Sequence, residues 1–140
     1  MASLTELRED HAQIVRTVKR LQVMISLPSP PSQLELFNLR RELSSTLISH
    51  LKAEDWVLYP RLKESGDSQV AAVATAFSEE MGGLSEAFLA YNNKWGAAAI
   101  EANWADYRAE TKAILDALTG RITRENRELY PLLEALDQAA

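Results

Sequence analysis

Apolar residues recur every three or four positions through four long segments of this chain, and this spacing restricts the fold more than any other feature. The stripes run from Leu4 to Ile25, from Leu36 to Val57, from Val70 to Tyr91 and from Tyr107 to Leu136. Residues with a period near 3.6 lie on one face of an amphipathic helix. Strands would need sustained alternation of apolar and polar residues, which the sequence lacks. The pattern therefore predicts an all-α protein.

Proline and glycine mark the breaks between the four segments. The clearest break is Pro28-Ser29-Pro30-Pro31, which cannot be helical inside, and others lie near Gly66 and from Asn92 to Gly96. Because most connections are short, neighbouring helices should run antiparallel. We predict an up-down-up-down four-helix bundle. Since 140 residues suit one domain, we expect a single bundle domain over residues 1–140.

Two serines have the spacing of helix N-caps. Ser3 precedes Glu6, and Ser32 precedes Glu35, each by the three residues of a capping box. The first and second helices are therefore expected to begin just after these serines.

Composition excludes several classes of protein. The chain has no cysteine, so it holds no disulfide, no cysteine zinc site and no iron–sulfur cluster. Its net charge is −5 and its basic residues form no stripe, so we expect no nucleic-acid partner. No apolar run reaches the roughly 20 residues needed to cross a membrane, and the charged start lacks a signal-peptide pattern. We expect a cytoplasmic protein that does not bind membranes.

Five polar residues interrupt the apolar stripes at positions that should face the core: His11, His50, Glu54, Arg121 and Glu125. A buried charge without a partner costs several kcal/mol, so such residues must pair with one another or bind a cation.

The two halves of the chain resemble each other. His50-Leu-Lys-Ala-Glu54 with Leu58-Tyr59-Pro60 matches Arg121-Ile-Thr-Arg-Glu125 with Leu129-Tyr130-Pro131, at an offset of 71 residues. The region of Asp10 and His11 matches Glu80 and Met81 at an offset of 70. We predict an internal repeat of two helix pairs related by a pseudo-two-fold axis.

The spacing of these residues suits a metal site. His50 and Glu54, four residues apart, lie on the same helix face and can reach a common point. His11 and Glu125 can converge on that point from neighbouring helices. Two imidazoles and two carboxylates suit iron, manganese or zinc, and bundle cores commonly hold such sites.

These motifs resemble the hemerythrin (HHE cation-binding) family over nearly the whole chain: a lone histidine in the first helix, His-x-x-x-Glu with Leu-Tyr-Pro in the second, and a second Glu with Leu-Tyr-Pro in the fourth. The resemblance implies a carboxylate-bridged di-iron centre in a four-helix bundle. Matched by position, His11, His50, Glu54 and Glu125 are retained as metal ligands.

The same resemblance shows what this chain lacks. Met81 and Arg121 stand where the family has the histidines of the third and fourth helices, and both belong to the same iron. One iron thus keeps its ligands and the other keeps no imidazole. Because oxygen carriage uses one electron from each iron, the resemblance argues against that activity and for an at most mononuclear site.

Three functions follow as alternatives. The first is a protein that binds one iron or other divalent ion and senses iron, oxygen or nitric oxide. The second is a metal-free bundle that acts as a regulatory or protein-interaction module, with Arg121 and the carboxylates in a salt-bridge network. The third is a mononuclear iron oxidase or peroxidase. The sequence suggests no substrate pocket or second catalytic base, so we expect no catalytic residues.

Two further observations bear on these alternatives. A divalent ion beside Glu54, Glu125 and Arg121 would leave a charge of +1, and Arg121 would repel it. At about 4 Å and an effective dielectric constant near 20 this repulsion is on the order of a few kcal/mol.

In addition, Tyr59, Tyr130 and Trp56 are candidates to line a pocket, and Gly82-Gly83 is a candidate kink.

Overall fold

The structure, a computed structural model, describes residues 3–139 and contains no strand within that range. Residues 1, 2 and 140 of the expected single domain lie outside the described part. The predicted all-α class is confirmed. The α-helices are α1 (Leu4–Ile25), α2 (Gln33–Lys52), α3 (Tyr59–Lys63), α4 (Ser68–Met81), α5 (Leu84–Lys94), α6 (Ala97–Ala102), α7 (Trp104–Arg124) and α8 (Tyr130–Ala139). Two π-helical turns interrupt the helices, η1 (Ala53–Leu58) between α2 and α3 and η2 (Glu125–Leu129) between α7 and α8.

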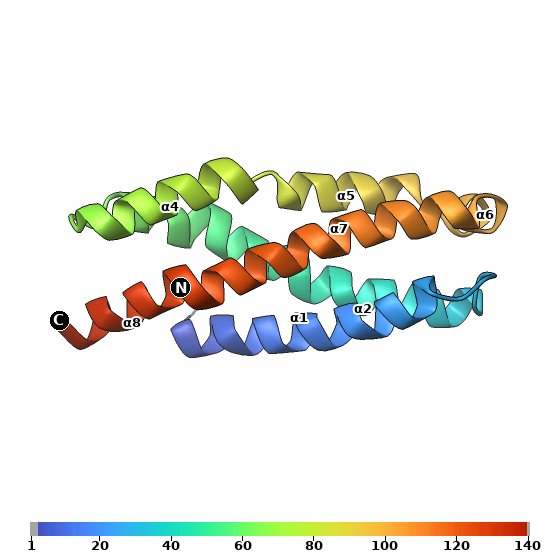
Figure 1. The fold of residues 1–140 in the computed structure, drawn as a ribbon, viewed down its shortest axis with the longest axis horizontal. Helices are drawn as coiled ribbons and strands as arrows, with labels where there is room; N and C mark the ends of the chain where they lie inside the picture. Colours follow the sequence, from blue (N-terminus) through green and yellow to red (C-terminus); the bar gives the residue numbers. More distant parts are fainter. Residues whose placement is uncertain (1–2, 140) are drawn as a thin grey trace.

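The helices lie along one long axis, and successive segments reverse direction (Figure 1). α1 leads toward the end that holds α6, and α2, η1 and α3 return from it. α4 and α5 lead to that end again, and α7, η2 and α8 return (Figure 1). α1 packs against α2 and α7, α3 packs against α4, and α5 packs against α7 and α2. The side chains of Ser3 and Ser32 accept hydrogen bonds from the backbone N–H groups of Glu6 and Glu35, as their spacing predicts.

The core is divided into two apolar clusters. One extends from the middle of the bundle to the α6 end and includes Ile14, Leu47 and Leu118. The other lies at the end that holds both termini and includes Leu7, Phe77 and Leu129. Between them lie the five polar residues that interrupt the stripes, all of them buried: His11, His50, Glu54, Arg121 and Glu125. We call this set the polar layer.

The two π-turns stand at repeat-related positions and have the same cause. Pro60 and Pro131 each follow a turn after one intervening tyrosine. A proline has no N–H to donate, and its ring clashes with the carbonyl four residues earlier. In each turn the preceding tyrosine instead donates its backbone N–H to a carbonyl five residues back, Tyr59 to Glu54 and Tyr130 to Glu125. The predicted internal repeat thus extends to the irregularities of the helices.

The first π-turn also corrects the predicted stripe. Val57, expected on the inward face, is 42% exposed, and Trp56, considered as a pocket residue, is 71% exposed. The π-turn contains an extra residue, which shifts the helical register and turns Leu58 and Tyr59 toward the core instead.

The third apolar stripe is not one helix. It breaks into α4 and α5 at Gly82-Gly83, level with the polar layer, as the glycine pair indicated. A short helix not expected from the sequence, α6, follows the predicted break from Asn92 to Gly96.

Gly82→Ala should lower the free energy of unfolding by about 1–3 kcal/mol, because a Cβ atom there would overlap the carbonyl oxygen of Ser78. Gly83→Ala is the matched control, since nothing lies within 4 Å of its added Cβ, and it should cause no loss. Urea unfolding followed by circular dichroism measures both. Equal stability of the two variants would contradict the close approach at Gly82.

Candidate metal centre

Four side chains of the polar layer bring one ligand atom each to a common point. His11 comes from α1, His50 from α2, Glu54 from η1 and Glu125 from η2. All four are buried, and their ligand atoms lie within 4.8 Å of one another. The four residues predicted to converge therefore do so in the structure.

The two imidazoles are oriented by partners outside the cluster. His50 Nδ1 lies 3.0 Å from Asp10 Oδ2, and His11 Nδ1 lies 2.8 Å from Asn126 Oδ1. Both partner atoms accept hydrogen bonds, so each Nδ1 carries the donated proton and each Nε2 faces the cluster. This is the arrangement in which histidine ligands are held ready for a metal ion.

Each Nε2 faces a carboxylate oxygen across the cluster. His11 Nε2 lies 3.0 Å from Glu125 Oε1, and His50 Nε2 lies 3.0 Å from Glu54 Oε1. His50 Nε2 is buried, and despite this short contact it makes no well-directed hydrogen bond. A nitrogen and an oxygen this close repel through their lone pairs unless a proton or a cation lies between them. A cation bound by all four atoms would satisfy both pairs at once.

Opposing effects set the charge of His50. Burial lowers its pKa, but the carboxylates of Glu54 and Asp10 outweigh burial and raise the pKa to about 8. Without a cation, His50 therefore carries a second proton near neutral pH, and a bound cation would take the place of that proton.

Arg121 points into the core and uses every N–H group of its guanidinium. Nε donates to Glu125 Oε2 at 3.2 Å, and Nη2 donates to Glu54 Oε1 at 3.2 Å and to Asp55 Oδ1 at 2.7 Å. Nη1 donates to the backbone carbonyl of Met81 at 3.2 Å and reaches Asp55 Oδ2 at 3.5 Å. Five contacts thus match the five donors of the fork. Arg121 also lies 5.5 Å from the centre of the Tyr59 ring.

Asp55 and Asn126 were not predicted as parts of the site. Each directly follows a cluster glutamate, Glu54 or Glu125, at the repeat offset of 71. Asn126 accepts from His11, whereas Asp55 pairs with Arg121. A comparison of the residues that follow the two glutamates in the sequence would have found this difference. The residue after Glu54 is an aspartate, which can pair with an arginine, and the residue after Glu125 is an asparagine.

Two tyrosines connect the halves crosswise. The hydroxyl of Tyr59, five residues after Glu54 in the chain, donates to Oε2 of Glu125. The hydroxyl of Tyr130, in the other half, donates to Oε2 of Glu54 at 2.8 Å. Each π-turn therefore supplies a glutamate to the cluster, and the tyrosine after it holds the glutamate of the other turn.

The two glutamates differ in their electrostatic environment. Burial raises the pKa of Glu54, but His50 and Arg121 outweigh it and lower the pKa below its usual range. Burial and the charge of Glu54 raise the pKa of Glu125 above its usual range. The pair therefore keeps its two negative charges together only when enough positive charge lies beside it.

A comparison with known protein families identifies the family of this chain. The family model described as the hemerythrin HHE cation-binding domain matches residues 2–133. The chain belongs to the hemerythrin family. No protein of curated function and no solved structure matches it. No helix in the described part of the chain is long and apolar enough to cross a membrane.

One of the two metal positions implied by the hemerythrin family fits a cation here. An ion with bonds of about 2.0–2.2 Å holds its ligand atoms about 3–4 Å apart. The four ligand atoms lie within 4.8 Å, so small side-chain movements bring them into range. The unpartnered His50 Nε2 marks the same point.

The second hemerythrin position does not fit a cation. The guanidinium of Arg121 fills it and already binds Glu54, Asp55 and Glu125. Met81 is half-buried and turns its sulfur toward Arg124, at 4.0 Å from Nη1, rather than toward the cluster. The side of the cluster that the resemblance assigns to the second metal ion thus holds an internal cation, Arg121.

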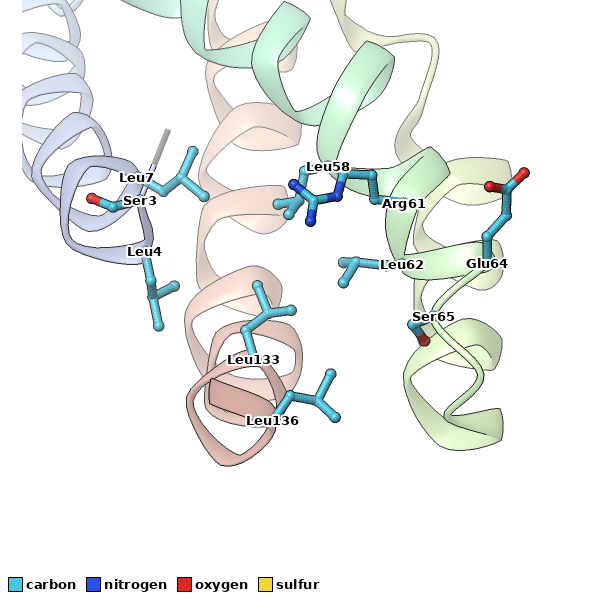
Figure 2. Close-up of a pocket in the computed structure, with 10 residues that line it drawn as sticks. All are labelled: Ser3, Leu4, Leu7, Leu58, Arg61, Leu62, Glu64, Ser65, Leu133 and Leu136. Carbon is cyan, nitrogen blue, oxygen red and sulfur yellow. The ribbon is translucent and has the colours of Figure 1, made fainter. Parts of the chain in front are cut away.

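A pocket of about 570 Å³ lies near the cluster but does not include it. Figure 2 shows leucines of α1, α3 and α8 pointing into a gap at the end of the bundle, with Ser3, Arg61 and Glu64 around it. Its lining contains none of the four candidate ligands and neither Tyr59, Tyr130 nor Trp56. The tyrosines considered as pocket residues instead pack in the core beside Leu7 and Leu58.

Arg121→Leu in metal-free protein should lower the free energy of unfolding by about 3–5 kcal/mol, because it leaves buried carboxylates without their cation. Arg124→Leu is the control. Arg124 pairs with Glu80 and Glu128 at the surface with its side chain 38% exposed, so its loss should cost about 1 kcal/mol or less. Chemical denaturation in the presence of a chelator measures both. Equal losses would show that Arg121 is no more important to the fold than a surface arginine.

Proposed function

We propose that this hemerythrin-family chain binds one divalent metal ion at His11, His50, Glu54 and Glu125, and that the ion is iron. Two imidazoles and two carboxylates are donors that suit iron, and Asp10 and Asn126 orient both rings toward the ion. A single bound ferrous ion with an open coordination position can take a small gaseous ligand such as oxygen or nitric oxide.

The observation that carries this proposal is the pairing of Arg121 with Asp55. With Arg121, Glu54 and Glu125 alone, a bound divalent ion would leave a net charge of +1, and Arg121 would repel the ion. Asp55 lies 2.7 Å from Arg121, is only 14% exposed, and supplies the missing negative charge. With Asp55 included, the group carries a net charge of −2, which one divalent cation neutralises.

The pairing of Arg121 also supports the kind of function that we propose. Arg121 occupies the place of a second iron, so the site has one redox-active ion at most. Carriage of oxygen as peroxide needs two electrons, one from each iron of a pair. We therefore propose a role in sensing iron, oxygen or nitric oxide rather than oxygen carriage.

A metal-free bundle is the second candidate function, and one observation favours it. Arg121 satisfies all of its donors inside the protein, so the carboxylates are partly neutralised without any metal. In that case the polar layer is a structural salt-bridge network, and the bundle acts as a regulatory or protein-interaction module.

Metal content separates the two candidates. The purified protein, loaded anaerobically with ferrous iron and desalted, should retain about one iron per chain by plasma mass spectrometry. His50→Ala should reduce this to background, because it removes one of two imidazole ligands.

Glu110→Ala serves as the matched control, since it removes a carboxylate paired with Lys94 at the surface, and it should retain the iron. Background iron in the unaltered protein would overturn the proposal and favour the metal-free bundle. Two irons per chain would contradict the assignment of Arg121 to the second position.

A further inference from the structure

The phenol oxygen of Tyr130 lies against two of the four candidate ligand residues, Glu54 and His11. It is 2.8 Å from Glu54 Oε2 and 3.1 Å from His11 Nε2, and the residue is fully buried. The Tyr130 ring stacks on the His11 imidazole, with ring centres 5.0 Å apart and planes inclined by 16°. The oxygen is thus held at the edge of the cluster by a ring that cannot easily turn away.

These spacings are those of neighbouring ligands on one ion. Bonds of about 2.0–2.2 Å at right angles place two ligand atoms about 3 Å apart. The two facing pairs of the cluster, His11 with Glu125 and His50 with Glu54, both show 3.0 Å. The Tyr130 oxygen lies at similar distances from His11 Nε2, 3.1 Å, and from the second oxygen of Glu54, 2.8 Å.

Tyr59, the repeat-related residue, has a different environment. Its hydroxyl also donates to a cluster glutamate, Glu125, but its ring lies under the guanidinium of Arg121 rather than on an imidazole. The two tyrosine rings therefore pack against different groups, Tyr59 against a guanidinium and Tyr130 against an imidazole. Tyr59 faces the position filled by Arg121, and Tyr130 faces the position formed by the histidines.

We propose that Tyr130 is a fifth protein ligand, which binds a ferric ion at this site through its phenolate oxygen. The inference rests on the proposed single-iron function. As the oxygen–iron bond forms, the phenol O–H bond breaks and its proton is released to solvent, with no change in the oxidation state of the ion. Phenolate is a hard oxygen ligand of the kind that tyrosine supplies to ferric iron in other proteins.

The test is a spectrum of the iron-loaded full chain after oxidation with one equivalent of ferricyanide. A tyrosinate–iron(III) bond gives a broad visible charge-transfer band and resonance-enhanced phenolate vibrations in Raman spectra. Tyr130→Phe should retain iron but lose the band and the vibrations. Tyr59→Phe, the matched control, should keep both, because its ring faces Arg121.

A second measurement does not depend on how Tyr130→Phe folds. Unaltered protein grown with ring-deuterated tyrosine should show the phenolate vibrations shifted to lower frequency. One iron per chain without any tyrosinate band, or a band lost only in Tyr59→Phe, would overturn the assignment of Tyr130 and leave the single-iron function intact. An unaltered protein that retains no iron would overturn both.

Discussion

The ion pair between Arg121 and Asp55 is the interaction on which the rest of this site depends. A guanidinium in the core of a bundle costs several kcal/mol unless its charge is paired and its donors are bonded. Here Asp55 takes two of the contacts, Glu54 and Glu125 take one each, and the Met81 carbonyl takes the last. Because Asp55 balances Arg121, the two glutamates can neutralise the cation that we propose on the opposite side, between His11 and His50.

The fold supports this arrangement through two irregular turns. Proline after each Leu-Tyr dipeptide forces a π-turn, which places a glutamate and a tyrosine from each half on the inward face. The tyrosines then hold the glutamates of the opposite half, so that η1 and η2 are connected through their side chains. Apolar clusters on both sides of the polar layer keep water away and strengthen each of these contacts.

Local sequence patterns were sufficient to predict the fold class and the convergence of His11, His50, Glu54 and Glu125, since helical spacing places each of them on a core-facing stripe. They did not predict that Val57 faces solvent, because a π-turn changes the register that the pattern assumes. The sequence patterns also did not predict which buried side chains pair with one another. The bond of Asp10 to His50 and that of Asp55 to Arg121 join different helices, and no local spacing encodes which carboxylate reaches which cation.

The most direct test of this account is the affinity for a divalent ion in Asp55→Asn, measured by competition with a chromophoric chelator under anaerobic conditions. The substitution keeps the shape of the side chain and a hydrogen-bond acceptor for Arg121, but removes the charge that balances it. The account predicts an affinity at least tenfold weaker than that of the unaltered protein, equivalent to about 1.4 kcal/mol. Equal affinity in the two proteins would contradict it, because Arg121 would then not need Asp55 to coexist with a bound metal ion.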